Sequence, residues 1–351
     1  MKKLLKSLLG ASMLVTLGAC SSGGDSTDET SCTLTVSTFQ LSEDIVNEDI
    51  IKPFEEQTGC EVITDLGNAA DRYTKLENNP ESGIDVIELN QSTAARGYEA
   101  GLFEKLEAAK VENINNLIGS AKTMQEESGY GPAYTIQSVG IIYDSETLGY
   151  EIESWDDLWN SDLEGSIAIP DITTTFGPAM VYIASDHAGV DITTDDGEAA
   201  FAALEELKPN VVKTYTKSSD LANMFAAGEI KAAVVGDFAV LNIQKADENA
   251  VYMVPESGTY ANFNTIDVVA SSDNKEMAYE YINWRISQEL QSVTAVSLNE
   301  GPTNAGVELS EEQTASMTYG EVAENAKAID YTFVNPLLTQ WTDQWNRILN
   351  R

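Results

Sequence analysis

Short apolar runs alternate with amphipathic stretches along the chain after residue 31. Three runs have the length and β-branched content of buried strands, at 34–39, 61–66 and 85–89. Each is followed by apolar residues at helical spacing, at 43–57, about 71–78 and about 93–100. Strands that alternate with helices through short connections predict βαβ units and a mainly parallel sheet with helices on both faces.

A second set of elements follows the same pattern. We expect strands at 139–144, 166–170, 230–235 and near 265–270. We expect helices that begin at Ser154 and at Ser218 or Ser219, and further helices at 176–184, 198–207 and 275–290. Near the C-terminus, Trp341 and Trp345 stand four residues apart, which is typical of one packed helix face. The fold class is therefore α/β, with two lobes and no linker between them.

The N-terminal residues predict where the protein is located. A lysine-rich start followed by the apolar stretch 8–17 indicates a signal peptide over 1–19. The sequence LGAC at its end resembles a bacterial lipobox, which predicts that Cys20 becomes lipidated. An ordinary signal peptide that contains a cysteine is the alternative. The small polar residues up to 31 predict a flexible tether over 20–31, so the body is expected outside the cytoplasmic membrane, anchored by lipid on Cys20.

Two cysteines remain if Cys20 is lipidated. Cys32 and Cys60 each open a predicted strand, and neighbouring parallel strands that begin at the same end of a sheet would bring them within bridging distance. An extracytoplasmic location permits a disulfide. Two unpaired buried thiols are the alternative. A metal site is disfavoured because there is no second cysteine pair and the single histidine, His187, is distant in sequence.

Composition excludes several classes of function. The chain has 57 acidic residues against 20 Lys and Arg, a net charge of −37, which opposes nucleic-acid binding. Its hydrophobic fraction of 42% is sufficient for a packed core. The catalytic motifs GxSxG, GxGxxG and HExxH and the Walker A motif are absent, and segment 191–197 departs from a calcium loop because Gly197 comes one place late. We therefore expect a binding protein, not an enzyme, without cofactor or metal.

Several longer stretches resemble one family, in the same order as in that family. These are FEEQTGCEV (54–62), YDSETLGYEIESWDDLWNSDLEGSIAIPD (143–171), MFAAGEIKAAVVGDFAV (224–240), AYEYINWRISQELQS (278–292) and EGPTN (300–304). They are similar to the substrate-binding lipoproteins of bacterial ABC importers, most of all to the spermidine/putrescine-binding branch. The cysteine pair is not a feature of that branch.

This resemblance implies a two-lobed periplasmic-binding-protein fold with hinge crossovers and a ligand cleft between the lobes. We expect lobe 1 to comprise 32–134 and 264–303, and lobe 2 to comprise 135–263 and 304–351. Lobe closure would capture a small solute, and the partners would be the permease and ATPase of an importer, with the receptor itself a monomer.

The resemblance places the ligand site on strand ends, helix starts and hinge crossings. The expected ligand-binding residues are Phe39, Gln40, Asn90, Gln91, Tyr134, Thr135, Asp171, Thr174, Thr175, Ser219, Asp237, Tyr260, Asn262 and Asn264. Gln137 and Phe238 lie beside them in sequence. Asp237 is the strongest candidate for an acidic ligand contact.

The sequence departs from the polyamine-binding pattern where that pattern carries acids and rings. Positions 172–175 read Ile-Thr-Thr-Thr, and the return crossing carries Asn262 and Asn264. Polyamine is thus the ligand that the family implies, whereas the residues suit a neutral, zwitterionic or anionic solute such as a sugar, an amino-acid derivative or a phosphonate. A surface hydrolase is a further alternative, although no acid–base pair is marked.

Overall fold

A computed structural model describes residues 32–40, 42–314 and 317–350. The signal peptide, Cys20 and the tether lie outside the described residues, so these three interpretations stay predictions.

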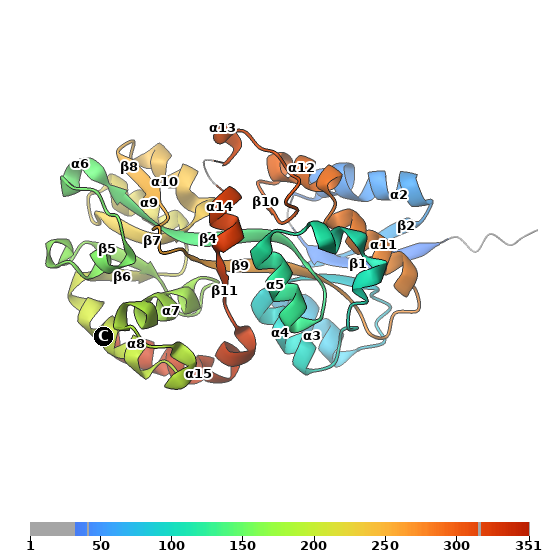
Figure 1. Cartoon of the computed structure of the whole chain (residues 1–351), viewed down its shortest axis with the longest axis horizontal. Helices are drawn as coiled ribbons and strands as arrows, with labels where there is room; N and C mark the ends of the chain where they lie inside the picture. Colours follow the sequence, from blue (N-terminus) through green and yellow to red (C-terminus); the bar gives the residue numbers. More distant parts are fainter. Residues whose placement is uncertain (1–31, 41, 315–316, 351) are drawn as a thin grey trace, which may run out of the picture. The chain divides into compact units, whose positions relative to one another are not determined.

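The described chain is built on one continuous ladder of strands in the order β2-β1-β3-β9-β4-β7-β5-β6, with β8 and β10 paired to β4 and β11 paired to β9. The strands are β1 (Thr33–Phe39), β2 (Glu61–Gly67), β3 (Val86–Asn90), β4 (Ala133–Asp144), β5 (Ile167–Pro170), β6 (Val211–Tyr215), β7 (Ala232–Gly236), β8 (Ala250–Met253), β9 (Tyr260–Val268), β10 (Gly301–Pro302) and β11 (Lys327–Ala328). The two groups β2-β1-β3 and β7-β5-β6 are parallel within themselves. Strands β9 and β4 run antiparallel to each other, and β9 is antiparallel to β3 and β4 to β7, whereas the short β11 pairs with β9 in parallel. Figure 1 shows β4 and β9 passing between two sets of helices.

Helices cover both faces of each parallel group, as the alternating pattern predicts. The first half contains α1 (Glu43–Ile45), a π-helical turn η1 (Val46–Ile51), α2 (Lys52–Thr58), α3 (Ala69–Asn78), α4 (Gln91–Glu99), α5 (Gly119–Ser128) and α6 (Ser145–Leu148). The second half contains α7 (Gly177–Ala188), α8 (Glu198–Leu207), α9 (Ser219–Ala226), α10 (Val240–Ala246), α11 (Lys275–Arg285), α12 (Gln288–Ser297), α13 (Glu311–Thr314), α14 (Gly320–Asn325) and α15 (Tyr331–Ile348).

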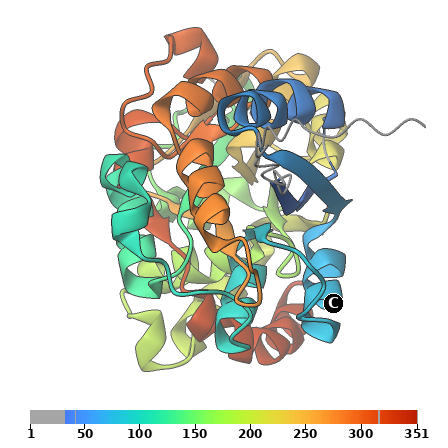
Figure 2. The ribbon, with the colours of Figure 1, turned by 90° about the vertical axis from the view of Figure 1, so that its right-hand side faces the viewer.

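Separate apolar cores support the two parallel groups. One core joins β1, β3 and β9 to α2, α11 and α12, and Phe54 meets Tyr281 edge to face with ring centroids 5.0 Å apart. Figure 2 shows the orange α12 beside the blue η1–α2 stretch that it contacts. The other core gathers around β5, β7, α7, α8 and α15, and contains the fully buried rings of Trp341 and Trp345. Both tryptophans therefore pack as predicted.

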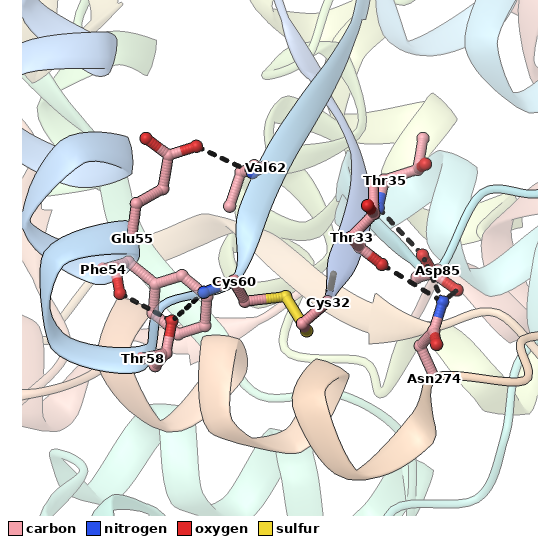
Figure 3. The surroundings of a disulfide bond; sticks show 10 residues. All are labelled: Cys32, Thr33, Thr35, Phe54, Glu55, Thr58, Cys60, Val62, Asp85 and Asn274. Atoms are coloured by element: carbon pink, nitrogen blue, oxygen red, sulfur yellow. Dashed lines mark hydrogen bonds between the residues drawn. A yellow bond between two sulfur atoms is a disulfide. The ribbon is translucent and has the colours of Figure 1, made fainter. Parts of the chain in front are cut away.

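The disulfide between Cys32 and Cys60 is present, with Cα atoms 4.6 Å apart (Figure 3). Its cause is the register of the first two strands, because Thr33 pairs with Glu61 directly after the two cysteines. The same end is held by a hydrogen bond from the Glu61 amide to the Cys32 carbonyl oxygen. The prediction from strand starts is confirmed.

Two sequence predictions were wrong in their boundaries. The helix expected over 275–290 is divided at Ser287, whose hydroxyl accepts the amide of Leu290 and begins α12 as a new helix. The strand expected over 139–144 begins at Ala133, since its first half pairs with β9 and its second half with β7. Long-range pairing extends this strand beyond its β-rich stretch. The residue boundaries of the two lobes stay a prediction.

Candidate functional site

The site is positioned by the opposed carboxyl ends of β3 and β7. Strand β3 ends at Asn90, which pairs with Asn264 of β9, and Asn264 in turn pairs with Thr135 of β4. Strand β7 runs the other way and ends at Gly236, opposite Val139 of β4. The two ends are therefore four residue steps apart along β4, from Thr135 to Val139, which is about 13 Å at 3.3 Å per step. Open α/β sheets bind ligands outside the carboxyl ends of their strands.

Five polar residues share one face of the sheet across this gap. Asn90, Asn264 and Thr135 form one rung, and Asn262 and Gln137 form the next rung two residues along. Directly paired residues lie on the same face, and so do residues two apart in a strand. We call these five residues the hinge row. The sequence analysis expected four of them to contact ligand and placed the fifth, Gln137, next to these in the sequence.

Asn90 Oδ1 accepts the amide of Thr93 at 2.9 Å, but polar atoms of the other four hinge-row residues lack protein partners. Thr135 Oγ1 and Asn262 Oδ1 are fully buried without a hydrogen bond. Gln137 and Asn264 are half-buried, and among the described residues their side chains make no hydrogen bond either. A buried polar group without a partner costs about 1–3 kcal/mol. Such a row is stabilised when a bound solute supplies the missing hydrogen bonds.

The two acids expected in the site make hydrogen bonds within the protein. Asp237 is buried, and its Oδ2 accepts the Thr318 amide at 2.7 Å and the Thr318 hydroxyl at 2.5 Å. Burial raises the pKa of Asp237 to about 6, although these hydrogen bonds oppose the rise.

Asp171 occupies the turn before α7. Burial alone would raise the pKa of Asp171, but hydrogen bonds from Thr173, Asn350 and Thr214 together hold it below its usual value. Both carboxylates thus already accept protein donors, and whether either contacts a ligand stays a prediction.

Aromatic rings flank the strand ends. Phe39 at the end of β1 is covered by the guanidinium of Arg72, 4.6 Å from the ring centroid. Phe176 and Phe238 stack with centroids 6.2 Å apart, and Phe238 is 46% exposed. Neither Phe176 nor Arg72 was expected from the sequence. The position of Phe176 directly after Thr175, an expected ligand-binding residue, was the available signal for it.

Tyr134 and Tyr260 are engaged elsewhere. Tyr134 is buried under the guanidinium of Arg285, 4.1 Å from its ring centroid. The Tyr260 hydroxyl donates to Asp186 at 2.8 Å. Their rings therefore contribute to packing around the hinge strands.

The remaining expected residues are spread around the site. Gln40 and Ser219 are exposed. The Thr174 hydroxyl donates to the carbonyl of Asp171, and the Thr175 carbonyl accepts the Tyr331 hydroxyl. Gln91 donates to the Ile329 carbonyl at 2.8 Å. None of these residues pairs into the hinge row.

A buried ionic network supports the β1 and β3 strand ends. Arg285 Nε contacts Glu88 at 3.0 Å, and its Nη2 donates to both carboxylate oxygens of Glu300, at 2.8 and 3.0 Å. The other oxygen of Glu88 accepts the Thr38 hydroxyl at 2.6 Å. Arg285 and Glu88 are nearly inaccessible, so Glu88 is neutralised by Arg285 inside the protein. In the described part of the chain no cluster of three or more acidic, His or Cys side chains could hold a metal.

This fold, with two α/β groups joined by paired crossing strands and a polar row between opposed strand ends, is that of the two-lobed periplasmic binding proteins. A solved ABC transporter protein from Clostridium perfringens is 54% identical, with a TM-score of 0.88, over 90% of this chain and all of that one. A spermidine/putrescine ABC transporter substrate-binding protein from Streptococcus pneumoniae, 17% identical, shares the fold with a TM-score of 0.72 over 90% of this chain and 99% of that one.

Sequence comparison is consistent with the fold. The family model of bacterial extracellular solute-binding proteins matches residues 49–320, and the chain belongs to that family. A spermidine/putrescine-binding periplasmic protein of Salmonella typhimurium is 23% identical over 71% of this chain and 72% of its own. A gamma-aminobutyric acid-binding protein of Pseudomonas aeruginosa is 25% identical over 86% of this chain and 84% of its own. Among the described residues, no helix has the length and apolarity that a membrane span requires.

Proposed function

We propose that the protein is the substrate receptor of an ABC importer, which captures a small organic amine between its lobes and delivers it to a permease and ATPase. The observation that carries the proposal is the hinge row, with two buried, unpartnered oxygens on Thr135 and Asn262. Both oxygens can accept hydrogen bonds from an ammonium group. Lobe closure would exclude water and strengthen these contacts.

Two ligand classes follow from the relatives. Relatives named for spermidine and putrescine support a polyamine, and a relative named for gamma-aminobutyric acid supports a zwitterion. The arrangement of the acids favours the zwitterion, because Asp171 and Asp237 already accept internal hydrogen bonds. A di- or tri-cation would lack free carboxylates on the hinge row, whereas one ammonium group needs only neutral acceptors.

Thermal unfolding of the mature domain, with each candidate ligand added separately, tests the proposal. A ligand at a hundredfold excess over its Kd adds about 2.7 kcal/mol of stability. Putrescine, spermidine, gamma-aminobutyrate, a sugar and a phosphonate form the panel. We expect stabilisation by the zwitterion above that by the polyamines. Stabilisation by the sugar or the phosphonate alone would refute the amine assignment, and turnover of any compound would indicate an enzyme.

Side-chain replacement then locates the site. Thr135→Val removes an unpartnered buried hydroxyl at nearly constant volume, so it should stabilise the free protein by about 1–3 kcal/mol while weakening ligand binding about tenfold. Thr33→Val at the far end of β1 is the matched control and should retain wild-type affinity. Equal affinity of wild type and Thr135→Val for every ligand would show that the solute binds elsewhere.

We also propose that lipid on Cys20 anchors the protein outside the cytoplasmic membrane and that the receptor acts as a monomer. Cys20→Ala should release the protein from the membrane fraction into the medium or periplasm. Continued membrane attachment of this variant would contradict the anchor. Sedimentation of the mature domain at the mass of a dimer would contradict the monomer.

A further inference from the structure

A cavity lies on the opposite face of the hinge strands from the hinge row. It has a volume of about 260 Å³ and lies among α4, α5, β9 and the chain that links β11 to α15. Thr265 lines it, and Thr265 is the neighbour of Asn264 in β9, so the two side chains point to opposite faces of the sheet. The cavity is thus separate from the proposed solute site.

Gln91, one of the lining residues, has an unpartnered acceptor. Gln91 is only 8% exposed, and its Nε2 donates to the Ile329 carbonyl at 2.8 Å. This bond leaves Oε1 as the free end of the amide, fully buried and without a hydrogen-bond partner. An amide oxygen only accepts, so the missing partner must be a hydrogen-bond donor.

The charged residues that line the cavity are both acidic, although the ammonium group of Lys105 donates to the carbonyl of Ser128 in the lining at 2.8 Å. Exposed Glu127 and Asp330 line its rim, and its lining contains no Lys, Arg or His. Asp330 uses Oδ1 to cap α15 by accepting the amides of Thr332 and Phe333. Behind the lining, the buried carboxylate of Asp267 accepts the hydroxyls of Thr265 at 2.9 Å and Tyr98 at 3.4 Å. A donor that also carries positive charge is therefore favoured.

The walls are largely carbon. Ala95, Met124 and the rings of Tyr98 and Tyr331 line the cavity beside the single free amide oxygen. Ca²⁺ and Mg²⁺ require six or more oxygen ligands, which this lining does not supply around one point. An alkyl chain with one ammonium group matches both the apolar walls and the acceptor, and aromatic rings add cation–π attraction.

We propose that this cavity is a second binding site for a small primary alkylammonium ion, with the ammonium group donating to Gln91 Oε1 and balanced by Glu127 and Asp330. The site goes beyond solute capture in the hinge row and does not depend on the identity of the transported solute.

The test is a ¹H–¹⁵N NMR titration of the mature protein with n-butylammonium chloride at constant ionic strength. We expect saturable shifts of the Gln91 side-chain amide and of the backbone amides of 328–332. Gln91→Met keeps the length of the side chain and removes the oxygen, and it should weaken this binding at least fivefold. Glu127→Gln should weaken it about twofold, because this acid is exposed and screened.

Glu126→Gln is the matched control, since it removes the same charge from the neighbouring exposed position of α5, outside the cavity lining. It should leave the affinity unchanged. Shifts confined to the amides of Asn262 and Asn264, or no saturation by about 20 mM, would overturn the second site. Equal weakening by Glu126→Gln and Glu127→Gln would also overturn it, because the effect would then come from the general negative field.

Discussion

The ionisation of Asp237 should make the stability of this protein decrease as pH rises from about 4 to about 7. Asp237 is buried beside Thr318 and has no cationic partner among the residues that the structure describes, so burial raises its pKa from 3.8 to about 6. A carboxyl whose pKa is higher in the folded state favours the protonated native form. Its stabilising contribution is therefore complete below about pH 4 and is lost as pH rises through about 6.

The size of the effect follows from the difference between the two pKa values. A change from 3.8 to about 6 corresponds to about 3 kcal/mol in total, at 1.36 kcal/mol for each unit. Between pH 4.5 and 7.5 the unfolding free energy should decrease by about 2 kcal/mol on account of this group. Asp267, whose pKa burial also raises to about 6, should add a similar decrease.

Urea unfolding at pH 4.5, 5.5, 6.5 and 7.5 measures the effect in wild type and in Asp237→Asn. The substitution itself can change the unfolding free energy by a constant amount at every pH. Apart from this constant, the variant should gain about 2 kcal/mol of stability relative to wild type between pH 4.5 and pH 7.5. The variant should retain the decrease due to Asp267, and Glu248→Gln serves as the charge-matched control on the exposed surface. Parallel curves for wild type and Asp237→Asn would refute the reasoning.

Three further replacements test the architecture by urea unfolding. Loss of the Cys32–Cys60 bridge, which spans 28 residues, should lower the unfolding free energy by about 3–4 kcal/mol. The double Cys→Ser variant should then be insensitive to reductant. A wild type that is equally stable with and without reductant would contradict this prediction. Arg285→Ala leaves Glu88 buried without its cation and should lower the unfolding free energy by about 3–5 kcal/mol. Combining Glu88→Gln with Arg285→Met should recover much of this loss. No recovery would show that packing, and not charge, accounts for the loss. Gly131→Ala would place its Cβ 1.9 Å from a β9 carbonyl oxygen and should cost at least about 2 kcal/mol, so a stability equal to wild type would disprove the close approach.

The local sequence pattern was sufficient to predict strands that pair with a neighbour close in sequence. The β1 and β2 strands lie next to each other in the sheet and begin at the same end, so their apolar runs predicted both the pairing and the disulfide. The long strand β4 was underestimated because Tyr, Thr and Gln interrupt the apolar pattern of its first half. Its pairing with β9, more than a hundred residues later in the chain, determines its length.

The sequence predicted where the residues of the candidate site lie better than it predicted the hydrogen bonds that they make. Strand ends pointed to Asn90, Thr135, Asn262 and Asn264, and the structure brings these four together on one face. Strand ends could not reveal that the Asp237 carboxylate accepts Thr318, since that partner comes from a segment 81 residues away. Side-chain hydrogen bonding across such separations has no local signature in the sequence.

The sequence alone determined the alternation of strands and helices, the pairing of two cysteines and the family to which the chain belongs, because periodicity, strand starts and ordered motifs are local properties. Only the tertiary structure decided which polar groups remain free. Polar residues lie on both faces of β9, where Thr265 donates to Asp267 while Asn262 keeps an unpartnered oxygen. Whether an atom is satisfied depends on which distant segments fold against it, and that is a property of the packed chain.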